Sequence, residues 1–399
     1  MRSATLEAGF TGGANPTGAR AYNDRLILSL IRSDGPLSKA ELSRRTGLSP
    51  QTLGMIVRRL CDEALLIAEA PVRGRQGQPS TPFRLNPDAV FAFGLKIGRR
   101  SATLTLCDFG GAVRGRAEEH YRYPTPEAVA AFARREATRL LSPLSATLRD
   151  RLIGTGIAMP FGLWDWEEAL GAPPGALLPW RDVDVAEMVA DALGGGSASL
   201  SNDATAACAA ELTALRGPPH DFCTVFVGWF VGGGTVLDGR LHVGRTGNAG
   251  ALGSMLVQGP DGPVPLLQPA SLMTLERAVG SPLPPVDATD DYWRTEPAER
   301  WITGAAAAIA QAAVNVSSVI DFGVLRVDGA FPTAVRARLV AAIREAHARL
   351  DRRGLSPLAI EEGRAGPDAR SIGAAMLPIL AEYSRDSDVL IKRRSTSRF

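Results

Sequence analysis

Residues 38–60 read SKAELSRRTGLSPQTLGMIVRRL and predict two short helices separated by a tight turn. Ser38 and Glu41 have the spacing of a capping box, in which each side chain satisfies a free backbone N–H at a helix start. Gly47 can adopt the left-handed conformation that ends a helix, and Ser49, followed by a proline, is a typical N-cap for the next one. Together these features predict a helix-turn-helix, whose second helix enters the major groove of DNA.

The second helix is expected to have a buried face and a solvent face. Its buried stripe follows the i, i+3, i+4, i+7 spacing and consists of Leu53, Ile56, Val57 and Leu60. The solvent face is predicted to reach base edges with Gln51 and Thr52 first, together with Ser49 and Met55. Flanking arginines are predicted to neutralise phosphates, and these are Arg44, Arg45, Arg58 and Arg59. A lone methionine such as Met55 more often packs than reads bases. Gly54 costs about 1 kcal/mol of helix stability, but its missing side chain allows DNA or another helix to approach closely.

Segments on both sides complete a small winged domain. The apolar spacing over 22–32 predicts a first helix, which the sequence DGP at 34–36 ends. Strand-like residues 65–67 and 83–85 enclose a basic tip, so they predict a wing. The predicted DNA contacts of this wing are Arg73, Arg75 and Gln78, and Arg75 or Gln78 could reach the minor groove. The alternative is a generic three-helix bundle with a run of surface charge.

Composition limits the class of protein. The chain has 399 residues, of which 45% are hydrophobic and 22% charged, so two or three packed domains are expected. No stretch approaches the roughly 18 uninterrupted apolar residues that a membrane span requires. The start of the chain lacks an apolar signal core, and the cysteines form no CxxC pair. We therefore expect a cytoplasmic protein without disulfides or a cysteine zinc site.

The positive charge of the chain lies in its first quarter. Residues 1–88 carry 12 Lys and Arg and 8 Asp and Glu, a balance of +4. The other residues carry 32 Lys and Arg and 34 Asp and Glu, a balance of −2.

Several short motifs resemble the repressor branch of the ROK family, a group of repressors, uncharacterised reading frames and sugar kinases. They are residues 15–20 (NPTGAR), Tyr22-Asn23, the wing at 74–79 and the exit Leu85-Asn86-Pro87. The resemblance implies a winged helix-turn-helix fused to an α/β body of the actin and hexokinase (ribonuclease H-like) ATPase fold, with two lobes around a cleft. We expect four segments: an N-terminal extension at 1–21, a DNA-binding domain at 22–88, an effector and dimerisation domain at 89–383, and a basic tail at 384–399.

The remaining patterns agree with a layered α/β body. Three successive strands are expected at 91–97, 102–108 and 113–119. Helices and strands then alternate, with helices at 126–148, 185–193 and 204–215 and strands at 152–159 and 198–200. After a glycine-rich hairpin region at 222–253, further elements are expected at 298–320, 324–327, 333–350 and 369–382. Such alternation predicts α/β layers.

The body lacks residues that the resemblance assigns to catalysis. Lys96 stands where family kinases carry an aspartate that helps to hold the metal of MgATP, so it would repel Mg²⁺. Ala251 and Ser254 stand where the family has a sugar-binding glutamate and a zinc-bridging histidine. Residues 258–265 contain none of the cysteines of its zinc motif. Asp328 replaces a glycine of the adenine-side loop. We therefore expect no enzyme activity, no cofactor and no metal.

Polar residues of the expected cleft remain, and we predict that they bind an effector. They are Gly162, Asn202, Asp203, Asn248 and Gln268. Asn202-Asp203 resembles an Asn-Asp pair of the family, whose aspartate is the base that activates the sugar hydroxyl in its kinases. Both residues also directly precede a helix, so they equally predict a helix cap. Tryptophans in the segment after Gly162 can stack on a sugar but more often pack as core or dimer contact, and these are Trp164, Trp166 and Trp180. Lys96 with Arg99 and Arg100 could instead hold a phosphate, which would make an anion site.

These features predict a transcriptional regulator, a repressor of carbohydrate-related genes, whose inactive kinase-like body senses an effector and forms a homodimer or tetramer. Its expected partners are double-stranded operator DNA and a sugar or sugar derivative, with no membrane. Two copies would place their recognition helices in successive major grooves, about 34 Å apart. The alternatives are a DNA-binding dimer whose body is only a scaffold, and an active carbohydrate kinase.

Overall fold

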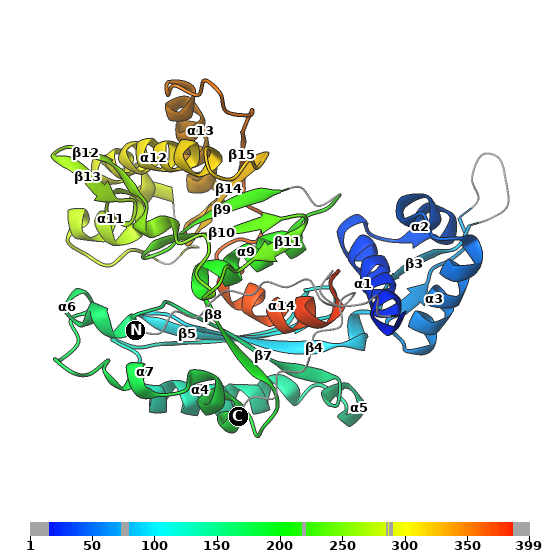
Figure 1. The fold of residues 1–399 in the computed structure, drawn as a ribbon. Helices are drawn as coiled ribbons and strands as arrows, with labels where there is room; N and C mark the ends of the chain where they lie inside the picture. Colours follow the sequence, from blue (N-terminus) through cyan, green and yellow to red (C-terminus); the bar gives the residue numbers. More distant parts are fainter. Residues whose placement is uncertain (1–15, 73–79, 218–220, 285, 287–289, 386–399) are drawn as a thin grey trace, which may run out of the picture. The chain divides into compact units, whose positions relative to one another are not determined.

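The computed structural model describes residues 16–72, 80–217, 221–284, 286 and 290–385 (Figure 1). Contacts divide the chain into two compact units, one of residues 1–86 with 381–399 and the other of residues 87–380. None of the helices in the described ranges is both long and apolar enough to cross a membrane.

The first unit contains three helices and a small sheet. Its helices are α1 (Pro16–Asp34), α2 (Lys39–Thr46) and α3 (Pro50–Asp62). Its antiparallel strands have the order β1 (Leu37–Ser38), β3 (Pro82–Leu85), β2 (Leu66–Ala68). The stripe predicted on α3 is buried, since Leu53, Ile56, Val57 and Leu60 are at most 5% exposed. The predicted start of the first helix at residue 22 is wrong, because α1 begins at Pro16. The prediction followed the apolar stripe from Leu26, whereas a proline fits the first turn of a helix without any apolar spacing.

The turn between α2 and α3 has the predicted geometry. The Ser38 N–H donates to the Glu41 carboxylate at 2.8 Å and the Glu41 N–H donates to the Ser38 hydroxyl at 3.3 Å, which confirms the capping box. Hydrogen bonds from the Ser38 hydroxyl and backbone lower the pKa of Glu41. Gly47 ends α2 with φ +70°, and the Ser49 hydroxyl caps α3 by accepting the Thr52 N–H at 3.2 Å.

The second unit contains two five-stranded sheets with the same strand order. In the first sheet the order is β6 (Val113–His120), β5 (Ser101–Asp108), β4 (Phe91–Ile97), β7 (Leu152–Met159), β8 (Ala198–Asn202). In the second it is β11 (Arg240–His242), β10 (Val231–Leu237), β9 (Phe222–Val227), β14 (Val324–Gly329), β15 (Ala359–Glu362). In each sheet the first three strands pair antiparallel and the last two are added in parallel. This repeated topology confirms the predicted body with two α/β lobes.

The helices of the body separate into long ones and short connectors. The long helices are α4 (Pro126–Leu141), α8 (Val185–Ala192), α9 (Asp203–Ala214), α11 (Leu272–Val279), α12 (Glu296–Ser317), α13 (Thr333–Ala348) and α14 (Ala369–Tyr383), and the short ones are α5 (Ala146–Arg149), α6 (Glu167–Leu170), α7 (Pro179–Asp182) and α10 (Leu267–Ala270). The single helix predicted over 126–148 is wrong, because α4 ends at Leu141 and α5 begins after Ser145. Ser142, before Pro143, still has helical φ and ψ, so the break lies at Pro143 itself, which has no N–H to donate to the preceding turn.

Two helices lie between the sheets, and their close packing requires glycine. A Cβ at Gly94 on β4 or at Gly156 on β7 would lie 1.9 Å from a backbone carbonyl oxygen of α14. A Cβ at Gly373 on α14 would lie 1.7 Å from a carbonyl oxygen of α9, and one at Gly234 on β10 would lie 2.4 Å from Cys208 on α9. The layers therefore run from the first sheet through α14 and α9 to the second sheet, with α4 and α13 on the outer faces (Figure 1).

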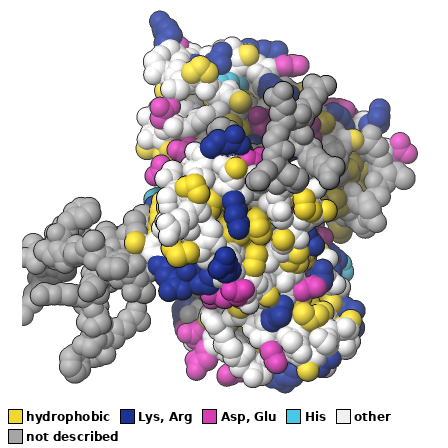
Figure 2. Space-filling view, turned by 90° about the vertical axis from the view of Figure 1, so that its right-hand side faces the viewer, with side chains coloured by type: hydrophobic (Ala, Val, Ile, Leu, Met, Phe, Trp, Pro, Cys, Tyr) yellow, Lys and Arg dark blue, Asp and Glu magenta, His cyan; other side chains and the backbone are white. Residues whose placement is uncertain are grey.

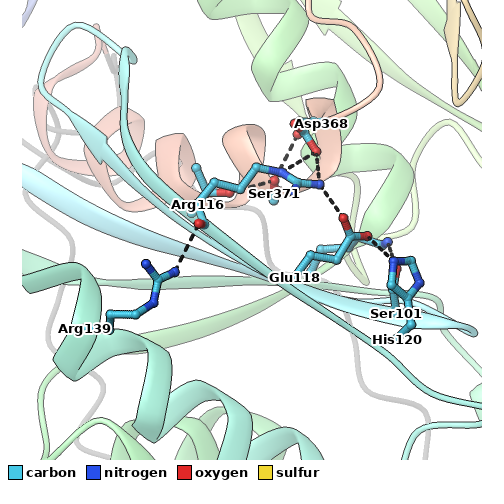
Figure 3. Close-up of polar contacts among 9 residues, drawn as sticks. Ser101, Arg116, Glu118, His120, Arg139, Asp368 and Ser371 are labelled. Carbon is cyan, nitrogen blue, oxygen red and sulfur yellow. Dashed lines mark hydrogen bonds and ion pairs between the residues drawn. The ribbon is translucent and has the colours of Figure 1, made fainter. Parts of the chain in front are cut away.

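Polar side chains fasten the start of α14 to the first sheet (Figure 3). Arg116 on β6 donates from Nε and Nη2 to the Asp368 carboxylate at 3.1 and 3.0 Å. The Thr105 hydroxyl on β5 donates to that of Ser371 at 2.9 Å. Because these partners flank Arg370, they hold the first turn of α14 and its arginine in place.

Candidate DNA-binding face and interlobe cavity

The solvent face of α3 carries the predicted base contacts. Ser49, Gln51 and Met55 are exposed, and Thr52 is half-buried. Met55 is 61% exposed, so it does not pack in the core of this unit. A Cβ on Gly54 would meet no atom within 4 Å, so nothing in the described part of the chain covers this side of the helix. The face is therefore open to a partner.

The four arginines predicted to contact phosphates differ in whether they form ion pairs within the protein. Arg44 and Arg58 are exposed and make no hydrogen bond or ion pair within the described ranges. Arg45 and Arg59 are each ion-paired with an aspartate of α1. Figure 2 shows Lys and Arg side chains mixed with acidic and apolar ones on the face that it presents, so charge alone does not single out a DNA-binding surface.

The wing is described only at its base. Strands β2 and β3 pair antiparallel with Leu66 opposite Leu85, and an isolated bridge joins Val72 to Ser80 beyond them. Residues of the predicted tip lie outside the described ranges, and these are Arg73, Arg75 and Gln78. The DNA contacts of this tip stay a prediction.

A cavity of about 210 Å³ lies between the two lobes of the body. Its wall combines loop residues that follow strands of the first sheet, residues of β9 and β10, and the segment 248–254. Its polar and charged lining side chains are Arg99, Asn202, Asp203, Asn248, Ser254 and Arg370, and its aromatic ones are Phe161, Trp166, Phe226 and Phe230. Side chains far apart in the sequence thus meet in one cavity.

The structure brings three of the five predicted effector residues together. Asn202, Asp203 and Asn248 line the cavity. Gly162 and Gln268 do not line it, although the residue next to each, Phe161 or Leu267, does. Sequence reasoning missed Arg370, because it lies on α14 and no local pattern connects that helix with β8. It also missed Phe230 as a cavity residue, because a glycine-rich hairpin explained its surroundings.

Asn202 and Asp203 have different roles at the start of α9. The Asn202 side-chain oxygen accepts the Ala204 N–H at 3.0 Å, which confirms the helix cap for this residue. Asp203 is the first residue of the helix, and its Oδ2 accepts a hydrogen bond from Arg370 Nη1 at 3.4 Å. Asp203 is thus held against a cation at the cavity wall.

Arg99 is enclosed by aromatic rings. Its Cζ lies 3.7 Å from the centroid of Phe230, 5.7 Å from that of Trp166 and 5.9 Å from that of Trp229. The residue is 8% exposed, and burial lowers the pKa of its guanidinium to about 9. Trp166 and Phe230 are themselves 4.2 Å apart between ring centroids. Cation–π contacts of this kind orient a guanidinium through its faces.

The predicted tryptophans have separate surroundings. Trp180 is 2% exposed and donates from Nε1 to the Pro124 carbonyl at 3.0 Å, so it is a core residue. Trp164 is partly buried and packs against the core of the first lobe. Only Trp166 of the three lines the cavity. The alternative of a core role is confirmed for Trp180.

Lys96, near the end of β4, is partly buried. Its Nζ donates to the Ser101 hydroxyl at 2.9 Å. Burial, together with the charge of Arg370, lowers the pKa of Lys96 to about 7, although Glu118 and two aspartates act in the opposite direction. An ammonium in this position would repel a divalent cation.

Two residues discussed in the sequence, Ala251 and Ser254, line the cavity with a methyl group and a hydroxyl. Residues 258–265 form most of a hairpin of β12 (Leu256–Gly259) and β13 (Gly262–Pro265). In the part of the chain that the structure describes, no group of three His, Cys, Asp or Glu side chains is placed to hold a metal.

The two units define a class of protein in which a winged helix is joined to a two-lobed body with the fold of the sugar kinases. Residues 20–63 match the family described as winged helix-turn-helix DNA-binding, and residues 92–378 match the ROK family. The chain belongs to the ROK family.

Relatives of the chain include regulators. The uncharacterized protein y4fQ of Sinorhizobium fredii (strain NBRC 101917 / NGR234) is 28% identical over 91% of this chain and 92% of its own length. The xylose repressor of Bacillus subtilis (strain 168) is 24% identical over 61% of this chain and 62% of its own length. Among solved structures, a ROK family transcriptional regulator, homolog of the E. coli MLC protein, has a TM-score of 0.61 at 20% identity, covering 92% of this chain and 97% of that one. This last similarity supports the fold.

Proposed function

We propose that the chain is a cytoplasmic, DNA-binding regulator of transcription that represses carbohydrate-related genes. The observation that carries this proposal is the open face of α3, capped at Ser49 and uncovered at Gly54, in a winged unit joined to a ROK body. The similarity to a xylose repressor supports the link with carbohydrates. In this proposal residues 22–88 bind DNA, and residues 89–383 form the sensing and dimerisation domain.

The proposed DNA contacts are assigned by which side chains of α2 and α3 are exposed and which are held by ion pairs. Gln51 and Thr52 lie in the first turn of α3, where a recognition helix meets base edges. Arg44 and Arg58 are exposed and have no ion pair with any described residue, so they can neutralise phosphates at little cost to folding. Arg59 is ion-paired with α1, so we assign it to helix packing rather than to phosphate binding.

The body is proposed to sense a ligand rather than to phosphorylate one. A kinase of this fold holds MgATP beside its first phosphate loop, and here Lys96 near the end of β4 disfavours Mg²⁺. Asp203, the residue that the resemblance equates with the catalytic base, is paired with Arg370. A coupled ADP-release assay over a panel of sugars checks this directly, and turnover above the rate without protein would contradict it.

The cavity favours ligand sensing over a scaffold role. Three of the polar residues predicted to bind an effector do meet in it, and these are Asn202, Asp203 and Asn248. Ligand binding between lobes can change their relative position and thereby the spacing of two DNA-binding units in a dimer. A ligand-independent scaffold needs no such cavity.

Selection of duplexes from a random DNA library with the full-length protein tests the proposal. We expect an enriched inverted repeat with half-sites about 10–11 base pairs apart between centres, as two copies related by a twofold axis require. Absence of any enriched sequence would contradict DNA-binding regulation, and a single unrepeated site would contradict the dimer.

A further inference from the structure

The cavity between the lobes has an excess of positive charge. Its charged lining residues are Arg99, Asp203 and Arg370, which amounts to two guanidinium groups against one carboxylate. A further cation, Lys96, is partly buried on β4 and is close enough for the charge of Arg370 to lower its pKa. A neutral ligand would leave this excess uncompensated.

Arg99 makes no hydrogen bond or ion pair with the described part of the chain, although the charge of Asp203 acts on it. It is 8% exposed, and its Nε is buried without an acceptor among the described residues. The Nε of Arg370 is also buried without an acceptor, and the one carboxylate of Arg370 is 3.4 Å away. Buried cations without acceptors are rare in proteins, because the lost hydration is not replaced.

Aromatic contacts do not replace the missing acceptors. Phe230 and Trp166 face the guanidinium of Arg99 through their π systems, which stabilise its positive charge. They leave its N–H groups unused, and these groups lie in the guanidinium plane, where a carboxylate or phosphate accepts two parallel hydrogen bonds. The aromatic rings thus leave the N–H groups of Arg99, a residue of the cavity wall, available to an oxyanion.

We propose that the cavity binds a small carbohydrate that carries an anionic group, a carboxylate or a phosphate, with this group on Arg99 and Arg370. The hydroxyls of the ligand would meet Asn248, Asp203 and Ser254, the other polar groups of the wall. The volume of about 210 Å³ lies below the roughly 300–1,000 Å³ of sites for drug-sized ligands, so it suits a single sugar unit. This inference rests on the proposed ligand-sensing function of the body.

Titration calorimetry on the full-length protein without DNA tests the inference. The probes are matched sets of a neutral monosaccharide, the corresponding uronic acid and the corresponding sugar phosphate, for several hexoses, pentoses and amino sugars, with inorganic phosphate alone as a further arm. We expect at least one anionic member to bind with a Kd at least about tenfold lower than its neutral parent. The uronic acid and phosphate arms show which anion the site takes.

Variants connect the preference to the two arginines. Arg99→Gln and Arg370→Gln are each expected to raise the Kd of the anionic ligand about tenfold or more and to raise that of the neutral parent by less. Arg300→Gln is the control, since Arg300 is exposed on α12, away from the cavity lining, and pairs with Glu296 four residues earlier. If one cavity variant fails to fold, the other and the comparison of ligands on the unaltered protein still decide the outcome.

Two results would overturn the inference. One is a neutral sugar that binds as tightly as its anionic counterparts, and the other is no binding by any anionic member. The calorimetry contains no DNA, so its outcome is separate from that of the DNA selection. If the protein selects a specific DNA sequence but prefers neutral sugars, only this inference is rejected. If it binds an anionic sugar but selects no specific DNA sequence, only the proposed regulation of transcription is rejected.

Discussion

Arg59 on α3 is ion-paired with Asp24 on α1, whereas Arg58, the residue before it, is exposed and makes no ion pair within the described ranges. Two consecutive arginines thus face different surroundings. The helix turns by about 100° per residue, so one side chain returns to the helix bundle while the other points to solvent. This difference gives a matched pair of variants on a single helix.

Arg58→Ala is expected to weaken DNA binding by about tenfold and to leave the unfolding temperature unchanged. The lost phosphate contact should also reduce the slope of log Kd against log salt by about 1. Fluorescence anisotropy with the selected duplex at several salt concentrations measures both quantities.

Arg59→Ala is expected to act on the fold instead. Its loss leaves Asp24 half-buried without its cation, and we expect the free energy of unfolding to fall by about 1 kcal/mol. Urea denaturation measures this value. Equal effects of the two variants on DNA binding would contradict the separate roles assigned to them.

Gly54→Ala and Gly304→Ala form a second matched pair. Both glycines are inside helices and a Cβ at either would meet no atom within 4 Å, so each substitution should stabilise its helix by about 1 kcal/mol. Only Gly54 lies on the proposed DNA face, so only Gly54→Ala should reduce DNA affinity, by several-fold. Unchanged affinity in the Gly54 variant would show that DNA does not approach α3 closely at this point.

Gly156→Ala is expected to destabilise the body by about 1–3 kcal/mol. The new methyl group would lie 1.9 Å from a carbonyl oxygen of α14, so the helix would have to move away from β7. Thermal unfolding compares this variant with Gly304→Ala as the open-space control. A Gly156 variant as stable as the unaltered protein would contradict the direct contact between α14 and the first sheet.

Lys96→Met is expected to change how stability depends on pH. Burial lowers the pKa of Lys96 from 10.5 to about 7, so between these values the unfolded chain binds more protons at this residue than the folded one. The contribution of Lys96 to the free energy of unfolding therefore rises with pH, by about 2 kcal/mol or less from pH 7 to pH 9.

The methionine variant lacks this contribution, so its stability should exceed that of the unaltered protein most at pH 7. Urea denaturation at pH 7 and pH 9 measures the difference. Parallel pH dependence in the two proteins would mean that Lys96 keeps its charge in the folded state.

Local elements could be predicted from the sequence, because their signals lie within a few residues. The capping box of Ser38 and Glu41 and the strand at 152–159 agree with the structure. A prediction is wrong where two signals conflict. The apolar residues on both sides of Pro143 predict one continuous helix, whereas in the structure the helix ends before this proline.

The cavity could be predicted only in part. Asn202 and Asp203 were found because they stand in a recognisable pair before a helix. Arg370 and Phe230 could not be found, since their place beside Arg99 depends on how α14 and the second sheet pack against the first. Packing of this kind is set by contacts over hundreds of residues, such as the glycine contacts of α14, and leaves no local pattern.

The most direct test of the central claim is the ratio of two dissociation constants for the full-length protein at one physiological salt concentration. One is measured with the selected duplex, and the other with a scrambled duplex of the same length and composition. A sequence-specific regulator is expected to bind the selected duplex at least about 10³ times more tightly. Equal affinities for the two duplexes would contradict the account, because they would show that the winged unit holds DNA by charge alone.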